Sequence, residues 1–313
     1  MKAFLYYGIF FSIISSVYSQ PPIIEGKLYN STRGEAIYMP IGRISFADKV
    51  VAFSIGKPQA NEEFSNPEEA LGEPNYTHYK LPRYVSLGCK GQLIVEFTDN
   101  GFIDMDGPDL YVWEVGPSEE DFLFEISKDG KQWRSLGIIQ GGKSFIDIAP
   151  VVKKKREVFY FVRITDIEKI CTGNTPGVDI DAVGTISGVI KIDLNADVLF
   201  DSAQFYLKPE ALEVIENLAH KILKVGMAEI LVEGHTDSDG SEAYNVNLSQ
   251  QRANSVLKKL KEHLNEGEFL YITEAFGELK PITTNKTEAG KQQNRRVEII
   301  VLPHKDFYKK KGK

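Results

Sequence analysis

The 313-residue sequence lacks the short motifs that mark the common enzyme classes. It contains no HExxH zinc motif, no GxSxG nucleophile elbow, no P-loop and no GxGxxG dinucleotide fingerprint. It also lacks an excess of positive charge. The formal net charge is −7, and only the final segment, "HKDFYKKKGK", is locally basic. These absences favour a binding protein over an enzyme and give no indication of a nucleic-acid partner.

Long apolar runs are missing as well, except at the N-terminus. The segment "MKAFLYYGIFFSIISSVYSQ" has one lysine, an apolar run from Ala3 to about Val17, and small residues before Gln20. This pattern predicts a signal peptide over residues 1–19, cleaved after Ser19. The run is short for a bilayer span of roughly 20 residues, and no cysteine follows it to carry a lipid. We therefore expect an exported mature chain without a transmembrane segment.

Cysteine is scarce, since only Cys89 and Cys171 are present. In an exported protein, one pair of cysteines predicts a single disulfide, and two free buried thiols are the alternative. A bridge between them would close a long loop and stabilise the fold by on the order of 4 kcal/mol in the chain-entropy account.

Residues 24–188 alternate short apolar runs with turn residues and show no helical periodicity. The runs are "KVVAFSIG", "GQLIVEFTDNG", "DLYVWEVG", "FLFEISKDG", "WRSLGIIQGG", "VFYFVRITD" and "DIDAVGTISG". Runs of this length, rich in Val, Ile, Phe and Tyr, predict an all-β sandwich or jelly roll. Within "SKDGK", the Asp-Gly pair predicts a hairpin with a type I′ turn.

The pattern changes near residues 188–195, where we place a domain boundary without a flexible linker. Two amphipathic helices are predicted in "KPEALEVIENLAHKILKV", with Pro209 near its first turn, and in "SQQRANSVLKKLKEHLNEG", with Ser249 as N-cap. Strands are predicted in "VLFDSAQF", "AEILVEG", "FLYITEAFG" and "RRVEIIVL". The expected fold is multidomain: a β-sandwich over residues 24–188, an α+β domain of two helices over a small mixed sheet over 195–303, and a basic tail over 304–313.

An acid and a base in the second domain suggest a binding site. Asp237 follows the predicted strand "EILVEGHT", and Arg252 lies three residues after the predicted cap Ser249. Both side chains would then reach the same edge of the fold. A cation in a helix's first turn opposes the helix dipole, which marks Arg252 as functional. Such a pair matches a zwitterionic ligand, and the alternative is that Asp237 and Arg252 pair with each other.

The surrounding residues resemble a known family. "VEGHTDSDGSEAYNVNLSQQRANSV", followed by "AFGELKPITTNKTEAGKQQNRRVEIIV", resembles the C-terminal peptidoglycan-binding domain of the OmpA family over residues 197–302. The resemblance implies that Asp237 and Arg252 hold the zwitterionic end of meso-diaminopimelate in the peptidoglycan stem peptide. It further implies a non-catalytic protein in the periplasm or at the outer membrane of a diderm bacterium. By the same resemblance, Thr236, Asn245 and Arg295 complete the pocket, and the expected supporting residues are Gly234, His235, Leu248, Ser249, Asn294 and Arg296.

Two acidic stretches in the first domain are candidate calcium ligands. Asp106 and Asp109 flank a Gly-Pro turn, and Asp179 and Asp181 lie two apart on one strand face. Carboxylates so placed offer the hard oxygens that Ca²⁺ prefers, and ordinary turn chemistry is the alternative.

The phrase order from "ALGEPNY" to "PGVDIDAVGTI" resembles the galactose-binding-like, discoidin-type jelly roll over residues 45–188. This resemblance implies a glycan or protein partner for the first domain. Tyr76, Tyr79 and Tyr84 are candidates for sugar stacking, with core burial as the alternative. Two other functions stay open: an accessory or structural subunit of an envelope or secretion assembly, and a cell-wall or glycan hydrolase. No segment is left over for a third, catalytic domain, which counts against the hydrolase.

Overall fold

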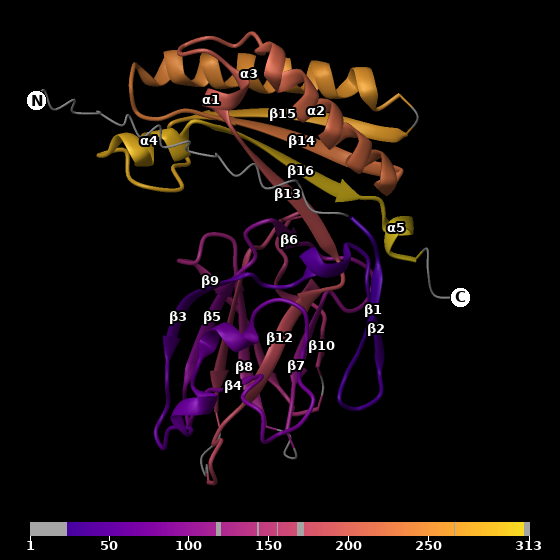
Figure 1. Ribbon diagram of the computed structural model, residues 1–313, viewed down its shortest axis with the longest axis vertical. Helices are drawn as coiled ribbons and strands as arrows, with labels where there is room; N and C mark the ends of the chain where they lie inside the picture. The colour runs from indigo at the N-terminus through magenta and orange to yellow at the C-terminus, as the bar shows by residue number, and fades with distance from the viewer. Residues whose placement is uncertain are drawn as a thin grey trace, which may run out of the picture.

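The computed structural model describes residues 24–309 except 117–119, 143, 155, 168–171 and 266. The predicted signal peptide and residues 310–313 of the basic tail therefore lie outside the described residues. The molecule is elongated, with β-strands filling one end and the long helices gathered at the other (Figure 1). No helix in the described ranges combines the length and apolarity needed to cross a bilayer.

The N-terminal part is all-β, as the sequence predicts, with short 3-10 turns at Gly42–Ser45, Glu62–Phe64, Pro67–Ala70 and Ala149–Val151. Its strands are β1 (Lys27–Asn30), β2 (Ala36–Met39), β3 (Lys49–Ser54), β4 (Val85–Ser86), β5 (Gln92–Glu96), β6 (Asn100–Phe102), β7 (Leu110–Glu114), β8 (Phe122–Ser127), β9 (Trp133–Ile139), β10 (Phe145–Ile146), β11 (Phe161–Asp166) and β12 (Asp179–Thr185). They form a β1–β2 hairpin, a four-stranded sheet in the order β10-β7-β12-β4, and a five-stranded sheet in the order β3-β5-β11-β8-β9.

The two larger sheets enclose one hydrophobic core, to which β4, β7 and β12 contribute from one side and β5, β8 and β11 from the other. Strands β5 and β11 alternate buried and half-buried side chains, as expected for a sheet with one face in solvent. Strands β7 and β12 are buried on both faces because the β1–β2 hairpin covers their outer side. There Trp113 packs against Phe46, with ring centroids 5.3 Å apart. We call this two-sheet unit the sandwich.

The turn in "SKDGK" differs from the prediction. Ser127 pairs with Trp133, so the loop between β8 and β9 has five residues, 128–132. A positive φ occurs only at Gly130 within it, whereas a type I′ turn needs two. The Asp129 carboxylate accepts the amides of Lys131 and Gln132 at 2.9 and 2.8 Å and so stabilises this longer loop. The predicted hairpin is confirmed, whereas the predicted type I′ turn is wrong.

The C-terminal domain begins with β13 (Gly188–Asn195), on which the predicted boundary falls. It continues through α1 (Ala196–Leu199), α2 (Pro209–Ile222), a 3-10 turn (Leu223–Val225), β14 (Met227–His235), α3 (Glu242–His263), β15 (Glu268–Gly277), α4 (Glu288–Asn294), β16 (Arg296–Pro303) and α5 (Lys305–Lys309). Helices α2 and α3 lie together on one face of the sheet (Figure 1). Their apolar stripes share one core with β13, β14 and β16.

Two predicted elements of this domain are wrong. "VLFDSAQF" does not form a strand, because the Asn195 side chain accepts the amide of Asp197 at 2.8 Å and starts α1 instead. Ser249 does not cap a helix. Helix α3 begins earlier, at Glu242, where the Ser241 hydroxyl accepts the Tyr244 amide at 3.3 Å. Ser249 is therefore a fully buried residue in the middle of α3.

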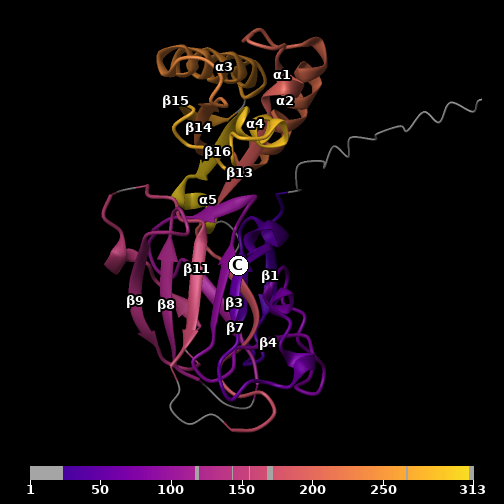
Figure 2. The same ribbon diagram turned by 90° about the vertical axis from the view of Figure 1, so that its left-hand side faces the viewer.

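One sheet crosses from the sandwich into the C-terminal domain. Strand β6 pairs with the start of β13, so the order is β15-β14-β16-β13-β6, with β14 and β15 parallel and all other pairs antiparallel. Figure 2 shows β13 rising directly from the top of the sandwich. Ile103 packs beside Ile300 and Leu302 along the same junction, and Arg156 forms an ion pair with Glu229. We call this contact the junction.

Gly101, in β6, gives a test of the junction. A Cβ atom there would lie 2.8 Å from side-chain atoms of Tyr160 and Val158 and 2.9 Å from the Phe159 carbonyl oxygen. Gly101→Val should therefore lower the free energy of unfolding by roughly 1–3 kcal/mol through overpacking. Denaturant unfolding measures this, with Glu274→Val at an exposed position of the same sheet as control. Equal unfolding midpoints for the two variants would contradict the packing described.

Candidate ligand-binding site

A cavity of about 540 Å³ opens where α1, α3 and the loop after β14 meet. Its lining is charged and polar, and five of the predicted residues contribute to it together with Leu248. The lining residues are Asp197, Phe200, Asp201, Ser202, Ala203, Lys208, Thr236, Asp237, Asp239, Tyr244, Asn245, Leu248, Arg252, Glu288 and Arg295. The structure thus brings the predicted pocket residues Asp237, Arg252, Thr236, Asn245 and Arg295 together.

The position of Arg252 corrects the sequence argument for it. Arg252 lies ten residues after the first residue of α3, almost three turns into the helix, so no dipole penalty singles it out. It belongs to the inward stripe of α3. That stripe is polar in its first half and apolar in its second: Asn245, Leu248, Ser249, Arg252, Ala253, Val256, Leu257 and Leu260.

Arg252 is a buried cation without an ion pair. The residue is 3% exposed, its Nε donates to the Gln204 carbonyl oxygen at 2.9 Å, and its guanidinium lies 5.2 Å from the Phe200 ring centroid. Among the described residues, no carboxylate comes within ion-pair distance of it. Burial lowers the pKa of Arg252, which Asp197, Tyr244 and Asp237 partly oppose. The N–H groups of the Arg252 guanidinium that donate no hydrogen bond to the described residues remain available to a ligand in the cavity.

Asp237 is held away from Arg252 by a third charged residue. Its Oδ2 accepts from Arg295 Nη1 at 2.6 Å, and its Oδ1 accepts the Asp239 amide at 3.0 Å. Arg295 also donates to both oxygens of Asp197, at 3.0 and 2.9 Å, and these hydrogen bonds raise its pKa. The predicted alternative, a direct pair between Asp237 and Arg252, is therefore absent. Each carboxylate oxygen accepts more than one hydrogen bond, so Asp237 can still receive a cationic group.

Two neutral residues complete the wall of the cavity. Thr236 is 4% exposed, and its Oγ1 has no hydrogen-bond partner within the part of the chain that the structure describes. Asn245 donates from Nδ2 to the Asp237 carbonyl oxygen at 3.3 Å and to Glu278 Oε2 at 2.6 Å. Asn245 therefore fixes the loop that carries Asp237, whereas the hydroxyl of Thr236 is free for a ligand.

The other expected supporting residues lie outside the cavity lining. Gly234 lets β14 approach α3, since a Cβ there would lie 2.1 Å from the Ser249 carbonyl oxygen. The Ser249 hydroxyl accepts the Gly277 amide at 3.0 Å. Asn294 accepts the amides of Ile282 and Thr283 at 2.9 and 3.1 Å. These residues hold the backbone around the site instead of facing a ligand.

Sequence reasoning missed three residues of the site: Asp197, Tyr244 and Glu278. Asp197 is the partner of Arg295, Tyr244 lines the cavity, and Glu278 holds Asn245. A signal existed for Asp197, because Asn195 followed by an acid two residues later is a typical helix start.

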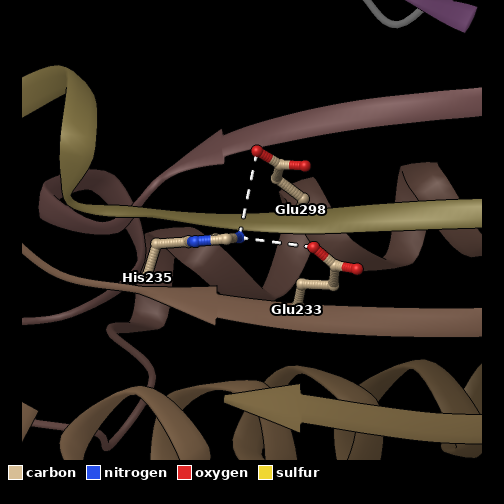
Figure 3. A group of neighbouring side chains, drawn as sticks. All are labelled: Glu233, His235 and Glu298. Atoms are coloured by element: carbon tan, nitrogen blue, oxygen red, sulfur yellow. Dashed lines mark ion pairs between the residues drawn. The ribbon is translucent and has the colours of Figure 1, made fainter. Parts of the chain in front are cut away.

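His235 lies in a second, buried cluster on β14 and β16 and does not line the cavity (Figure 3). Its Nε2 is 3.6 Å from Glu233 Oε2 and 3.9 Å from Glu298 Oε1, and its ring stacks on Phe276. This is a group of three potential metal ligands. The two carboxylates already face cations, however: Arg296 Nε donates to Glu298 Oε1 at 2.6 Å, and Lys280 lies 3.7 Å from Glu233. A divalent ion would add unbalanced positive charge to a buried site.

This environment makes the neutral form of His235 the stable one. The residue is 1% exposed, and burial lowers its pKa. The folded protein then binds fewer protons than the unfolded chain below the ordinary histidine pKa of about 6.5, so acidification disfavours folding.

We expect the free energy of unfolding to fall as the pH drops below about 6.5, and to fall less in His235→Gln. Urea unfolding at several pH values measures the difference between variant and wild type. His78→Gln, at an exposed histidine, should follow the wild-type curve. A pH dependence unchanged in His235→Gln would contradict the assignment.

The four predicted calcium ligands do not form one group. Asp106 is exposed, Asp181 accepts the amides of Asn75 and Tyr76, and Asp109 accepts those of Met105 and Ile148. Burial raises the pKa of Asp179 to about 8. Of the four, Asp109 alone belongs to a described set of potential ligands, with Asp104 and Asp147. Calcium binding stays a prediction.

Two further expectations concern the sandwich. Cys89 is disulfide-bonded, and Cys171 lies outside the described residues. Among the tyrosines, Tyr84 is buried against Phe64 and Tyr76 packs beside it, whereas Tyr79 is 52% exposed. Core burial therefore describes Tyr84, and Tyr79 is the exposed ring of the three.

Comparison with known proteins agrees with this geometry. The model of the OmpA family matches residues 199–295. The chain is 40% identical over 112 residues to outer membrane protein A of Bordetella avium, which is 36% of this chain and 57% of that protein. It is 31% identical over 115 residues to the putative lipoprotein YfiB of Escherichia coli (strain K12), 37% of this chain and 72% of that protein. It is 37% identical over 95 residues to the peptidoglycan-binding protein ArfA of Mycobacterium tuberculosis (strain CDC 1551 / Oshkosh), 30% and 29% of the two chains.

The chain spans little more than half the length of the Bordetella protein and under a third of the mycobacterial one. The match to the family model falls on the C-terminal α+β domain, where the site lies. Through this domain, the chain belongs to the OmpA family.

Proposed function

We propose that the C-terminal domain binds peptidoglycan non-covalently by holding the zwitterionic end of meso-diaminopimelate in the stem peptide. The buried guanidinium of Arg252, unpaired and facing a cavity, carries this proposal. Arg252 receives the carboxylate of the ligand and Asp237 its ammonium group. Thr236 adds a hydroxyl, while Arg295 and Asn245 keep Asp237 in place. The similarity to the peptidoglycan-binding protein ArfA of Mycobacterium tuberculosis supports the choice of ligand.

The expected affinity is modest. Hydrogen bonds to charged groups contribute about 1.5–3 kcal/mol each, and lost freedom of the ligand offsets part of the sum. Peptidoglycan repeats its stem peptide, so several copies of the protein on one wall gain avidity. The role is therefore tethering in the cell envelope.

For the sandwich, we propose a galactose-binding-type module whose loops bind a glycan or an envelope protein. Figure 1 places the sandwich at the opposite end of the molecule from α1, α3 and α4, which surround the cavity. The chain would then present its partner-binding end away from the wall, at the outer membrane or in the periplasm. A role as a structural subunit of an envelope or secretion assembly fits the same arrangement of sandwich and cavity, with a protein as the partner of the sandwich.

Sedimentation with purified peptidoglycan sacculi tests the wall-binding site. Asp237→Ala and Arg252→Ala each remove a charge-assisted contact and should weaken binding about tenfold or more. Arg252→Lys should fall between wild type and Arg252→Ala, because it keeps the charge and loses the planar fork. Arg163→Ala, which breaks an ion pair with Glu125 in the sandwich, is the matched control and should bind as wild type.

Circular dichroism and thermal unfolding establish that each variant is folded. If folded Asp237→Ala and Arg252→Ala sediment with sacculi as completely as wild type does, the cavity is not the wall-binding site.

A further inference from the structure

The loop after α1, residues 201–207, contributes to the cavity lining and also carries two aromatic residues, Phe205 and Tyr206, that are not part of that lining. Asp201, Ser202 and Ala203 line the cavity itself. Tyr206 follows three residues later and is 71% exposed, and its ring centroid lies 4.4 Å from that of Phe205. A single exposed tyrosine needs no explanation, so the case depends on how this loop is held.

The loop is fixed at both ends and in the middle. The Gln204 amide donates to the Asp201 carbonyl oxygen at 3.0 Å, and the Lys208 amide donates to the Leu199 carbonyl oxygen at 2.9 Å. The Gln204 carbonyl oxygen accepts a hydrogen bond from Arg252, the residue proposed to bind the carboxylate of the stem peptide. The backbone that carries Phe205 and Tyr206 is therefore held in place beside the cavity.

This conformation carries a local backbone cost. Ala203 has a φ of +57°, one of three positive-φ residues other than glycine among the described residues. A non-glycine residue in this region costs of order 1 kcal/mol or more and persists where the surroundings determine it. The fold therefore accepts strain beside the cavity while leaving Phe205 and Tyr206 outside the hydrophobic core.

We propose that Tyr206, supported by Phe205, forms a sugar-binding subsite that stacks on the pyranose ring bearing the stem peptide. This inference rests on the proposed function and extends it from the stem to the sugar. Aromatic faces suit the apolar C–H face of a pyranose, and an anchored backbone lowers the entropy that the loop loses on binding.

The two spans are compatible. In peptidoglycan, two amino acids and a lactyl ether separate diaminopimelate from the sugar, so the spacer can reach beyond the roughly 7 Å of two extended residues. Tyr206 follows Gln204, whose carbonyl oxygen contacts Arg252, by two residues, which span at most roughly 7 Å of backbone. A ligand whose third stem residue occupies the cavity can thus place its sugar against Tyr206.

Calorimetric titration with two synthetic ligands tests the subsite. The first is the stem tripeptide ending in meso-diaminopimelate, and the second is the same tripeptide attached to N-acetylmuramic acid. Wild type should bind the sugar-linked ligand roughly three- to tenfold more tightly than the tripeptide. Tyr206→Ala should lose this gain and keep its affinity for the tripeptide, whereas Tyr206→Phe should retain the gain.

Tyr79→Ala removes an exposed tyrosine from the sandwich and serves as the matched control, with both affinities as in wild type. Equal affinity of wild type for the two ligands, or an undiminished gain in Tyr206→Ala, overturns the sugar subsite and leaves stem binding intact. Failure of wild type to bind either ligand overturns the proposed function, and the subsite with it.

Discussion

A buried guanidinium that pairs with no carboxylate of the described residues is the constraint on which the C-terminal domain depends. Taking a charge out of water costs several kcal/mol, and within the described residues Arg252 recovers part of that through one carbonyl oxygen and the face of Phe200. The rest of the domain must hold this side chain in place, since an arginine free to move would reach solvent. Its position almost three turns inside α3 does so, at a cost in stability that a bound carboxylate would offset.

Keeping Arg252 unpaired requires that the nearby acids have other partners. Asp237 and Asp197 both bind Arg295, which lies between them with bonds of 2.6 to 3.0 Å. Without Arg295, the Asp237 carboxylate would be the natural partner of Arg252, and the two charges would close the cavity on themselves. The ion pair of Arg295 with Asp237 therefore separates the acid and the base of the proposed site.

The sequence predicted much of this site and misplaced the helix that carries it. Asp237, Arg252 and Arg295 could be predicted because they belong to motifs that follow one another in a fixed order along the sequence. The strands of the domain could be predicted from their apolar runs. The predicted start of helix α3 was too late because the inward positions of its first half are polar. Asn245, Ser249 and Arg252 occupy these positions at the site and interrupt the apolar period of the helix. Strand β6 could not be predicted, since "NGF" has the composition of a turn and becomes a strand only by pairing with β13, more than 80 residues away.

That missed strand changes how the two parts of the chain work together. A sequence without a linker predicts close packing, but the structure goes further and shares one sheet between them. Backbone hydrogen bonds between β6 and β13, with Ile103 against Ile300 and Leu302, leave no hinge at the junction. Inter-domain motion is the default where contacts are small and polar, and here apolar packing and the Arg156–Glu229 ion pair accompany a continuous sheet. Under the proposed function, a protein held to the wall through its cavity would therefore hold its sandwich in one orientation relative to the bound stem peptide.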